Sequence, residues 1–286
     1  MRVMTQNILF GGEARFEALC QVLAAARPDV LCLQECLGWE DGVRLPQLAA
    51  ALGLPADEAH VYLSPSNPRG SGRRFHLALL SRLPILTARS HTAGFAHSLL
   101  QATLALPPDD ALPSAENPPK TLTVFGAHLV AGNEDQRLAE TEVLLDHLNP
   151  HLHRGAPIVL LGDLNALSPE DPYPPDLDAR FTRLGITKYG SPPRFDVMRR
   201  LLTAPLFDTL PQRAPNTPWA TAIRGRRSPG PPSDERVETR SDYVLLSADL
   251  VEDLTDCGIV DVGTASDHHG VYADLRLRAS LPRLQR

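Results

Sequence analysis

The chain has 286 residues, 43% of them hydrophobic, which is enough for a sizeable buried core and excludes a chain that is disordered throughout. Its net charge of −6, from 34 acidic and 28 basic residues, argues against a broad cationic surface for non-specific nucleic-acid binding. A local basic rim remains compatible with this charge.

The N-terminus enters a strand-like pattern directly, without an apolar segment followed by a small-residue cleavage site. No run approaches the roughly 18 apolar residues that a membrane span requires. We therefore expect a cytoplasmic protein without a membrane span, and a monomer.

Apolar, β-rich runs and helical spacings alternate along the chain. The runs predict strands at Val3–Leu9, Val30–Leu33, Leu77–Leu80, Leu122–Leu129, Ile158–Leu161, Tyr243–Leu246 and Val271–Leu275. Helical spacing predicts helices over Ala14–Ala26, Glu134–Leu148 and Arg194–Leu202. The irregular distances between strands exclude a barrel of equal βα units, and the mixture indicates an α/β (α+β) fold.

The second of these helices has a clear expected orientation. Its apolar side is formed by Ala139, Val143, Leu144 and Leu148, and the acidic residues and Arg137 lie opposite. An amphipathic helix of this kind packs its apolar side on the core.

Proline is abundant, with 27 residues, and it is concentrated in segments near 107–119, 169–175 and 211–232. None of these segments is followed by a fresh, self-sufficient set of strands and helices. We therefore expect one domain over residues 1–286 in which they form surface loops, and loops of this kind commonly carry specificity.

The cysteines do not form a C-x-x-C pair or a zinc-like cluster with histidine. We expect free and mostly buried thiols in a reducing compartment, at Cys20, Cys32, Cys36 and Cys257.

Polar side chains follow the predicted strands at the point where each strand ends. They are Asn7, Glu35, His128, Asp163 with Asn165, and Asp267 with His268. Any one of them alone is ordinary turn or strand-end chemistry. Because the strands of one sheet bring their ends together, the set predicts a convergent site. Oxygen ligands without cysteine suit a hard cation, and Mg²⁺ in particular binds one or two carboxylates together with substrate phosphate oxygens.

These motifs resemble the endonuclease/exonuclease/phosphatase superfamily, in that superfamily's order and nearly from end to end. The matching segments are Thr5-Gln6-Asn7, Asp29–Glu35, Leu79–Ile85, Ala127-His128-Leu129, Gly162-Asp163-Leu164-Asn165, Arg240-Ser241-Asp242-Tyr243 and Ser266-Asp267-His268. The resemblance implies a four-layer α/β sandwich of two packed mixed β-sheets flanked by helices. It also implies a phosphoesterase in which water attacks the phosphate in line, without a covalent enzyme intermediate.

The resemblance implies a metal site and a water-activating pair. Glu35 is then the principal Mg²⁺ ligand, with Asn7 beside it and Asp267 near or on a metal, and Mn²⁺ is an alternative ion. Asp163 and Asn165 position the attacking water.

The histidines receive roles in the same way. His128 contacts the scissile phosphate, and His268, oriented by Asp242, stabilises or protonates the phosphorane. Families in this group assign the general base to the Asp163-type or to the His268-type residue, and both alternatives stay open here.

Basic residues in loops are candidates for substrate binding, namely Arg73, Arg74 and Arg226, although solvated loop arginines are the plainer interpretation. Cys36-Leu37-Gly38-Trp39 follows Glu35, where abasic-site endonucleases usually have Thr and Lys, so support for that subclass is reduced.

We favour a nuclease, with a phosphate ester as substrate and nucleic acid among the candidates. The alternatives are a phosphomonoesterase or lipid-headgroup phosphodiesterase of the same fold and, in another class, a catalytically silent phosphate-binding module.

Overall fold

The structure, a computed structural model, describes residues 1–107, 120–212, 218–224 and 237–276. Most of the predicted loops near 107–119 and 211–232 therefore lies outside the described residues, as does Arg226. The proline-rich segment 169–175 is described and contains no helix or strand.

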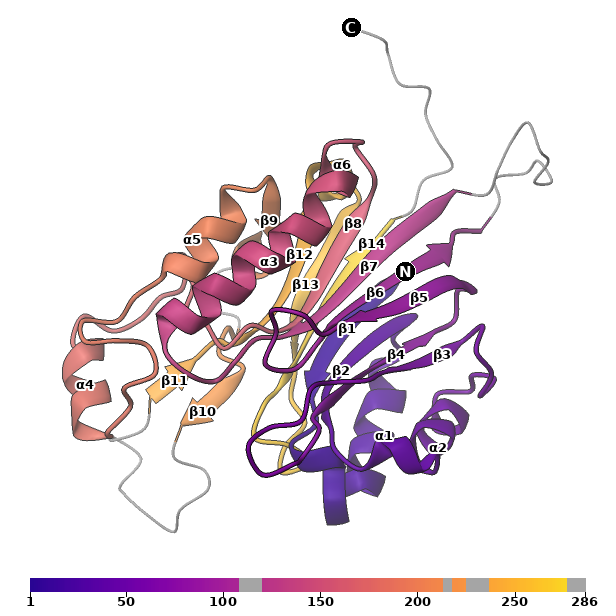
Figure 1. Cartoon of the computed structure of the whole chain (residues 1–286), viewed down its shortest axis with the longest axis horizontal. Helices are drawn as coiled ribbons and strands as arrows, with labels where there is room; N and C mark the ends of the chain where they lie inside the picture. The colour runs from indigo at the N-terminus through magenta and orange to yellow at the C-terminus, as the bar shows by residue number, and fades with distance from the viewer. Residues whose placement is uncertain (108–119, 213–217, 225–236, 277–286) are drawn as a thin grey trace, which may run out of the picture.

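Within the described residues, two mixed β-sheets of six strands each form the centre of the molecule (Figure 1). The first has the spatial order β13 (Leu254–Val260), β14 (Gly270–Leu275), β1 (Arg2–Asn7), β2 (Val30–Cys36), β4 (His76–Ser81) and β3 (Val61–Ser64). The second has the order β5 (Ile85–His91), β6 (Leu99–Ala105), β7 (Thr121–His128), β8 (Ile158–Asp163), β12 (Asp242–Ser247) and β9 (Leu206–Asp208). A separate hairpin pairs β10 (Ala222–Arg224) with β11 (Val237–Thr239).

Helices cover the outer face of each sheet, so the predicted four-layer sandwich is confirmed (Figure 1). On the first sheet lie α1 (Phe16–Ala26) and α2 (Arg44–Ala51). On the second lie α3 (Glu134–Leu152) and α5 (Asp196–Leu202). The shorter helices are α4 (Leu177–Arg183) and α6 (Ala248–Val251), and 3₁₀ turns span Phe10–Arg15, Trp39–Asp41 and Leu210–Gln212.

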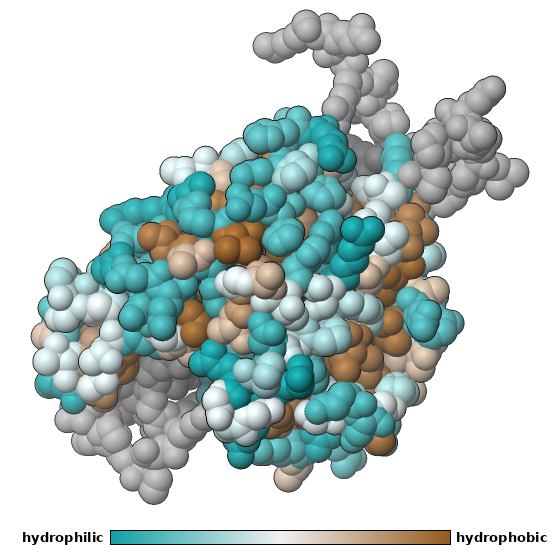
Figure 2. Space-filling model, in the orientation of Figure 1, coloured by the Kyte–Doolittle hydropathy of each residue, from teal (hydrophilic) through white to brown (hydrophobic). Residues whose placement is uncertain are grey.

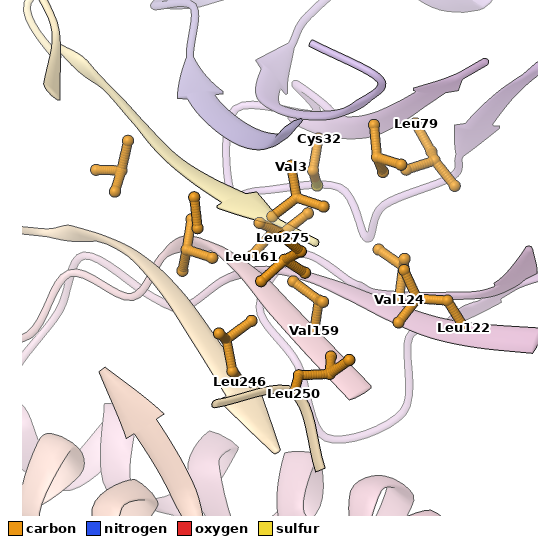
Figure 3. Packing of buried hydrophobic residues seen from close by; sticks show 14 of the residues in the cluster. Val3, Cys32, Leu79, Leu122, Val124, Val159, Leu161, Leu246, Leu250 and Leu275 are labelled. Carbon is orange, nitrogen blue, oxygen red and sulfur yellow. The ribbon is translucent and has the colours of Figure 1, made fainter. Parts of the chain in front are cut away.

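The layers follow from the alternation of side chains along each strand. In β1, Val3 packs into the core between the two sheets, whereas its neighbour Met4 packs under α1 and α2. In β8, Val159 faces the same inter-sheet core and Leu160 faces α3. Figure 3 shows this inter-sheet core, in which aliphatic side chains from both sheets meet. Strands buried on both faces explain the nearly continuous apolar runs in the sequence.

Most element boundaries differ by a few residues from those expected from the sequence, and for two of them the backbone gives the reason. Strand β1 ends at Asn7 because Leu9 and Phe10 have φ of 52° and 51°, which a strand does not accommodate. Helix α1 begins at Phe16 rather than at Ala14, because the backbone is left-handed at the two preceding glycines.

The orientation predicted for α3 is only partly right. Leu144 and Leu148 are buried as expected, but Ala139 is exposed, whereas Glu134 and Arg137 are buried. The polar side chains are buried because the first half of α3 packs against loops that offer hydrogen-bond partners, whereas its second half packs on the sheet.

The surface and the thiols complete the description. The four cysteines form no disulfide, and three of them are buried as expected, namely Cys32, Cys36 and Cys257. None of the helices in the described ranges has the length and hydropathy needed to cross a bilayer. The face drawn in Figure 2 is mostly hydrophilic, with hydrophobic patches between the polar side chains. Large apolar side chains that are exposed include Val43, Leu86 and Phe207.

The strand register sets where the polar residues lie. Parallel strands β1 and β2 place Asn7 opposite Gln34, next to Glu35. In the other sheet, parallel β7 and β8 place His128 opposite Asp163, and antiparallel β12 starts with Asp242 at the same level. The ends of both sheets therefore meet at one edge of the sandwich.

Candidate active site

At this edge lies a pocket of about 230 Å³ that is open to solvent. Segments far apart in the sequence form its wall: Phe10, Glu35, Arg69, Phe75, His97, His128, Ala131, Asp163, Asn165, Lys188, Asp267 and His268. Carboxylates, cations and flat rings thus share one small cavity.

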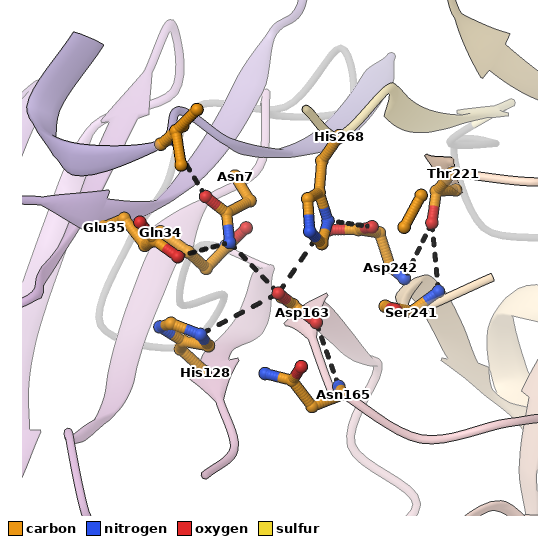
Figure 4. A network of polar contacts seen from close by, with 12 residues as sticks. Asn7, Gln34, Glu35, His128, Asp163, Asn165, Thr221, Ser241, Asp242 and His268 are labelled. Carbon is orange, nitrogen blue, oxygen red and sulfur yellow. Dashed lines mark hydrogen bonds and ion pairs between the residues drawn. The ribbon is translucent and has the colours of Figure 1, made fainter. Parts of the chain in front are cut away.

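Asp163 lies at the centre of the polar network (Figure 4). Its Oδ2 accepts a hydrogen bond of 3.0 Å from Asn7 Nδ2, and it lies 3.8 Å from a ring nitrogen of both His128 and His268. The side chain is 2% exposed, so these contacts act with little screening by water.

Glu35 is held at the rim of this network by the backbone of β2. The pairing of β2 with β4 is irregular before Cys36, and Glu35 itself has φ of 62°. A bulge of this kind re-aims a side chain, and backbone strain is common at functional sites. The carboxylate accepts hydrogen bonds from Asn7 Nδ2 at 3.2 Å and from the Phe10 backbone N–H at 3.0 Å.

Asp242 and His268 form a buried pair. Nδ1 of His268 donates to Asp242 Oδ2 at 2.8 Å, so Nε2 is the ring nitrogen that does not contact Asp242. The hydroxyl oxygen of Thr221 accepts the backbone N–H groups of Ser241 and Asp242 and so fixes the start of β12. Thr221 also binds the backbone beside His268, because its carbonyl accepts the N–H of His269.

Asn165 follows β8 with φ of 50°, a conformation that asparagine tolerates better than most residues. Its backbone N–H donates to Asp163 Oδ1 at 2.9 Å. Its side-chain Nδ2 donates to the Leu129 carbonyl at 3.0 Å, and its Oδ1 accepts from Lys188 Nζ at 2.7 Å. The amide is therefore fixed from both ends.

A second imidazole, that of His97, stacks on the ring of His128. The ring centroids lie 4.3 Å apart and the ring planes are 4° from parallel. Phe75 packs edge-on against His97, and Phe10 contacts Phe75, so the pocket has an aromatic wall beside its carboxylates. The Nδ1 atoms of both histidines are buried and hydrogen-bond to no group in the described part of the chain.

Burial and charge drive the pKa values of these groups in different directions. Burial raises the pKa of Asp163, but His268 first, then His128 and Lys188, oppose it and lower the pKa to about 2. For Asp242, burial prevails over its contact with His268 and the pKa is raised. Burial, followed by the charges of His128 and Arg69, lowers the pKa of His97 to about 2.

The structure brings most of the predicted residues into contact. Six of them line the pocket, and Asn7 and Asp242 lie directly behind it, each hydrogen-bonded to a lining residue. Arg73 and Arg74 do not line it, and Arg74 donates instead to the Ser66 carbonyl. Their neighbour Arg69 does line the pocket.

Sequence reasoning did not identify several lining residues: Phe10, Phe75, His97 and Lys188. Arg69 belongs to the same arginine-rich stretch as Arg73 and Arg74, and Phe75 directly follows it, so the composition of that stretch was a usable signal. His97 and Lys188 lie in loops without any periodic pattern, and nothing near them in the sequence points to a site.

The donor set is one that fits a divalent cation. Glu35 and Asp267 present carboxylates to the pocket, and hard oxygen ligands of this kind suit Mg²⁺ or Mn²⁺. Within the described residues, three side chains have ligand atoms that all lie within 4.8 Å of one another, which is close enough to hold an ion, namely Asp163, Asp242 and His268. There, however, the short contact between His268 and Asp242 is already a hydrogen bond.

Comparison with known families gives one clear match. The model of the Endonuclease/Exonuclease/phosphatase family matches residues 4–268, which is nearly the whole chain. No curated protein sequence matches.

Solved structures of similar fold cover the chain from end to end. An AP endonuclease from Archaeoglobus fulgidus superimposes with a TM-score of 0.68 at 18% identity, over 97% of this chain and 100% of that one. The 3′ phosphatase NExo (D146N) from Neisseria, bound to a product DNA hairpin, gives 0.67 at 20% identity, over 96% and 99%. Truncated Caenorhabditis elegans TDP2 gives 0.63 at 17% identity, over 96% of each chain. At these identities the likeness concerns the fold alone.

Proposed function

The chain belongs to the endonuclease/exonuclease/phosphatase family, and from that premise we propose that it is a divalent-metal-dependent phosphodiesterase that acts on nucleic acid. One observation carries the proposal. Asp163, a buried carboxylate whose pKa is lowered to about 2, faces two imidazoles and the amide of Asn7 at the edge where both sheets end.

The proposed chemistry starts from the ionised Asp163. Its carboxylate accepts a hydrogen bond from the attacking water and takes the proton of that water as the water oxygen bonds to phosphorus. Asn7 holds the carboxylate in place, and the neutral amide of Asn165 helps to orient the water without repelling an anionic substrate. His128 lies 3.8 Å from the same carboxylate oxygen, so its ring reaches a phosphate bound beside the water.

His268 acts on the leaving-group side of the phosphate. Asp242 binds its Nδ1 and orients the ring, so the other ring nitrogen serves to donate to an oxygen that becomes more negative as the bond to the leaving group breaks. The two carboxylates, whose pKa values shift in opposite directions, thus have different roles. Asp163 accepts from the attacking water, and Asp242 orients the His268 ring.

We assign the metal to Glu35 with Asp267, since both present oxygen ligands to the pocket. When bound there, Mg²⁺ or Mn²⁺ neutralises charge on the phosphate oxygens. Asn7 donates its Nδ2 to Glu35 and Asp163 and uses its Oδ1 to accept the Leu9 N–H, so it orients the carboxylates rather than serving as a ligand.

A nucleic-acid substrate is favoured by the mixed character of the wall. Arg69 and Lys188 contribute positive charge, and Phe10 and Phe75 offer partly exposed flat rings on which an unpaired base can stack. Arg73, Arg74 and Arg226 remain candidates for contacts with the strand beyond the pocket. We also propose a cytoplasmic location, since none of the four cysteines is joined to another in a disulfide.

Activity should be measured on single- and double-stranded DNA, RNA, bis(p-nitrophenyl) phosphate, a 3′-phosphorylated oligonucleotide and sphingomyelin, each with Mg²⁺, Mn²⁺ or EDTA. We expect hydrolysis of diesters that EDTA abolishes. Glu35→Gln and His268→Ala should each lower the rate by roughly 10²–10⁴-fold, since each removes charge stabilisation or proton transfer.

Matched controls are Glu58→Gln and His153→Ala, which change exposed side chains of the same types and should leave the rate unchanged. Mn²⁺ titration of the same proteins tests the metal assignment, because Glu35→Gln should weaken binding and Asp242→Asn should not. Strong loss of Mn²⁺ binding only in Asp242→Asn would move the metal to the Asp163 group. EDTA-resistant hydrolysis, or folded Glu35→Gln protein with wild-type activity, would refute the proposed function.

A further inference from the structure

Lys188 is a pocket-lining residue to which neither the sequence motifs nor the family resemblance gives a role. It lies between α4 and α5, next to the buried Tyr189, and its side chain is half-buried. Its ammonium reaches the amide of Asn165, the residue that follows the catalytic strand β8.

The contact determines which way the Asn165 amide faces. Oδ1 accepts from Lys188 Nζ at 2.7 Å, and Nδ2 donates to the Leu129 carbonyl at 3.0 Å. A flipped amide would place its NH₂ against an ammonium and its oxygen against a carbonyl, so both contacts would become repulsive. Because Asn165 is only 3% exposed, water cannot readily replace either partner.

The position of Lys188 is in turn fixed from the interior. Its backbone carbonyl accepts from Arg137 Nη2 at 2.5 Å, and Arg137 is fully buried and paired with Glu134 at 2.8 Å. Its ammonium also lies 4.8 Å from the centre of the Tyr189 ring, within the range of a cation–π contact. The buried Glu134–Arg137 pair therefore holds the backbone of Lys188, and the Tyr189 ring lies beside its ammonium.

We propose that Lys188 is a positioning residue of the reaction, which holds the Asn165 amide so that its N–H faces the attacking water or a phosphate oxygen. The same ammonium adds positive charge to the wall that carries the anionic Asp163. This role rests on the proposed phosphodiesterase function, but the orientation of the amide can be tested without it.

The kinetic arm uses Lys188→Met, Lys188→Arg, Asn165→Ala and the double variant Lys188→Met/Asn165→Ala on the best diester of the panel. We expect Lys188→Met to lower kcat on the order of tenfold to a hundredfold with KM changed less than about threefold, because a charged hydrogen bond is lost. Lys188→Arg, which keeps a donor, should recover part of the rate. Adding Lys188→Met to Asn165→Ala should lower kcat by less than about a further threefold relative to Asn165→Ala alone, since the two residues act together.

The spectroscopic arm records the side-chain amide signals of Asn165 in ¹H–¹⁵N spectra, identified by their loss in Asn165→Ala. Lys188→Met should shift these signals and speed their exchange with water, whereas the exposed Arg183→Met should change neither the signals nor the rate. These spectra also show whether each variant is folded.

Unchanged amide signals in folded Lys188→Met, or losses of rate that multiply fully in the double variant, would overturn the proposal. If the wild-type protein hydrolyses nothing in the panel, the proposed function fails. The amide signals then still decide whether Lys188 orients Asn165.

Discussion

Asp163 and Asp242 show how strongly surroundings determine the behaviour of one residue type. Both carboxylates are almost completely buried, at 1% and 0% exposure. The pKa of Asp163 is nevertheless lowered to about 2, while that of Asp242 is raised, because several cationic groups face Asp163 whereas burial prevails at Asp242. Perturbed pairs of this kind cluster at functional sites, which supports the different roles proposed for the two side chains.

His97 is the residue in this site whose ionisation should be visible in stability. Burial, followed by the charges of His128 and Arg69, lowers its pKa to about 2 in the folded protein, whereas an unfolded histidine titrates near 6.5. As pH falls below about 6.5 the unfolded state binds a proton that the folded state does not, so stability is lost progressively down to about pH 2.

We therefore expect His97→Phe to reduce the acid sensitivity of the fold. At pH 4.5 the wild-type histidine costs about 2.7 kcal/mol relative to neutral pH, since two pH units at about 1.36 kcal/mol each separate it from its unfolded pKa. Phenylalanine keeps the stacking on His128 but does not titrate. Urea unfolding at pH 7.5 and 4.5 measures the difference, and the exposed His153→Phe is the control. Equal pH dependence in wild type and His97→Phe would show that His97 is not held neutral.

Helix α3 links two loops of the second sheet through a single buried side chain. Glu140 reaches out of it and accepts two backbone N–H groups, from Ala96 at 2.6 Å and from Val130 at 2.7 Å. Ala96 directly precedes His97, and Val130 follows His128 by two residues. One buried carboxylate thus holds the loop that carries His97 and the loop that follows His128 at the end of β7.

Glu140→Gln should loosen both loops. An amide has only one acceptor oxygen, so one N–H would face an NH₂ group, and we expect a loss of about 1–3 kcal/mol in the free energy of unfolding. Activity should fall as well, because these loops flank His97 and His128. Glu142→Gln on the same helix is the matched control, since its exposed pairing with Arg200 contributes about 1 kcal/mol or less. If the two variants were equally stable, the role assigned to Glu140 would be wrong.

At the scale of elements, the predictions were best for the strands. Strands β1, β2, β7 and β8 are buried on both faces, so each appears in the sequence as an apolar run. The polar residue at the end of each run indicated the site. Helix α3 was misread in its first half because a buried Glu134–Arg137 pair has the same pattern as a solvated face. Lys188 could not be found at all, because only the tertiary contact with Asn165 gives it a role.

At the scale of the whole molecule, the site exists only because the two sheets pack in one relative position. Asn7 comes from the first sheet and Asp163 from the second, and their hydrogen bond of 3.0 Å joins the sheets at the edge that carries the candidate site. The register of each sheet follows from its own strands, but the offset between sheets depends on side chains in the core between them. Cys32 and Gly126 are one such contact, from β2 and β7.

Gly126→Ala tests this packing directly. A Cβ at residue 126 would lie 2.5 Å from Sγ of Cys32, which is fully buried, so the sheets must shift or the sulfur must move. We expect a loss of about 1–3 kcal/mol in the free energy of unfolding, as is usual when a packed core is overfilled. Activity should fall with it, because a shift between the sheets lengthens the bond between Asn7 and Asp163.

Cys32→Ala supplies the compensating change, since it removes the sulfur that the new methyl group would meet. Alone it should cost about 1 kcal/mol through the small cavity it leaves. Combined with Gly126→Ala it should restore both stability and rate, with a coupling of about 1 kcal/mol or more between the two positions. Urea unfolding and diester hydrolysis of all four proteins measure that coupling. Additive losses in the double variant would mean that contacts other than this one set the distance between the sheets, and hence the geometry of the site.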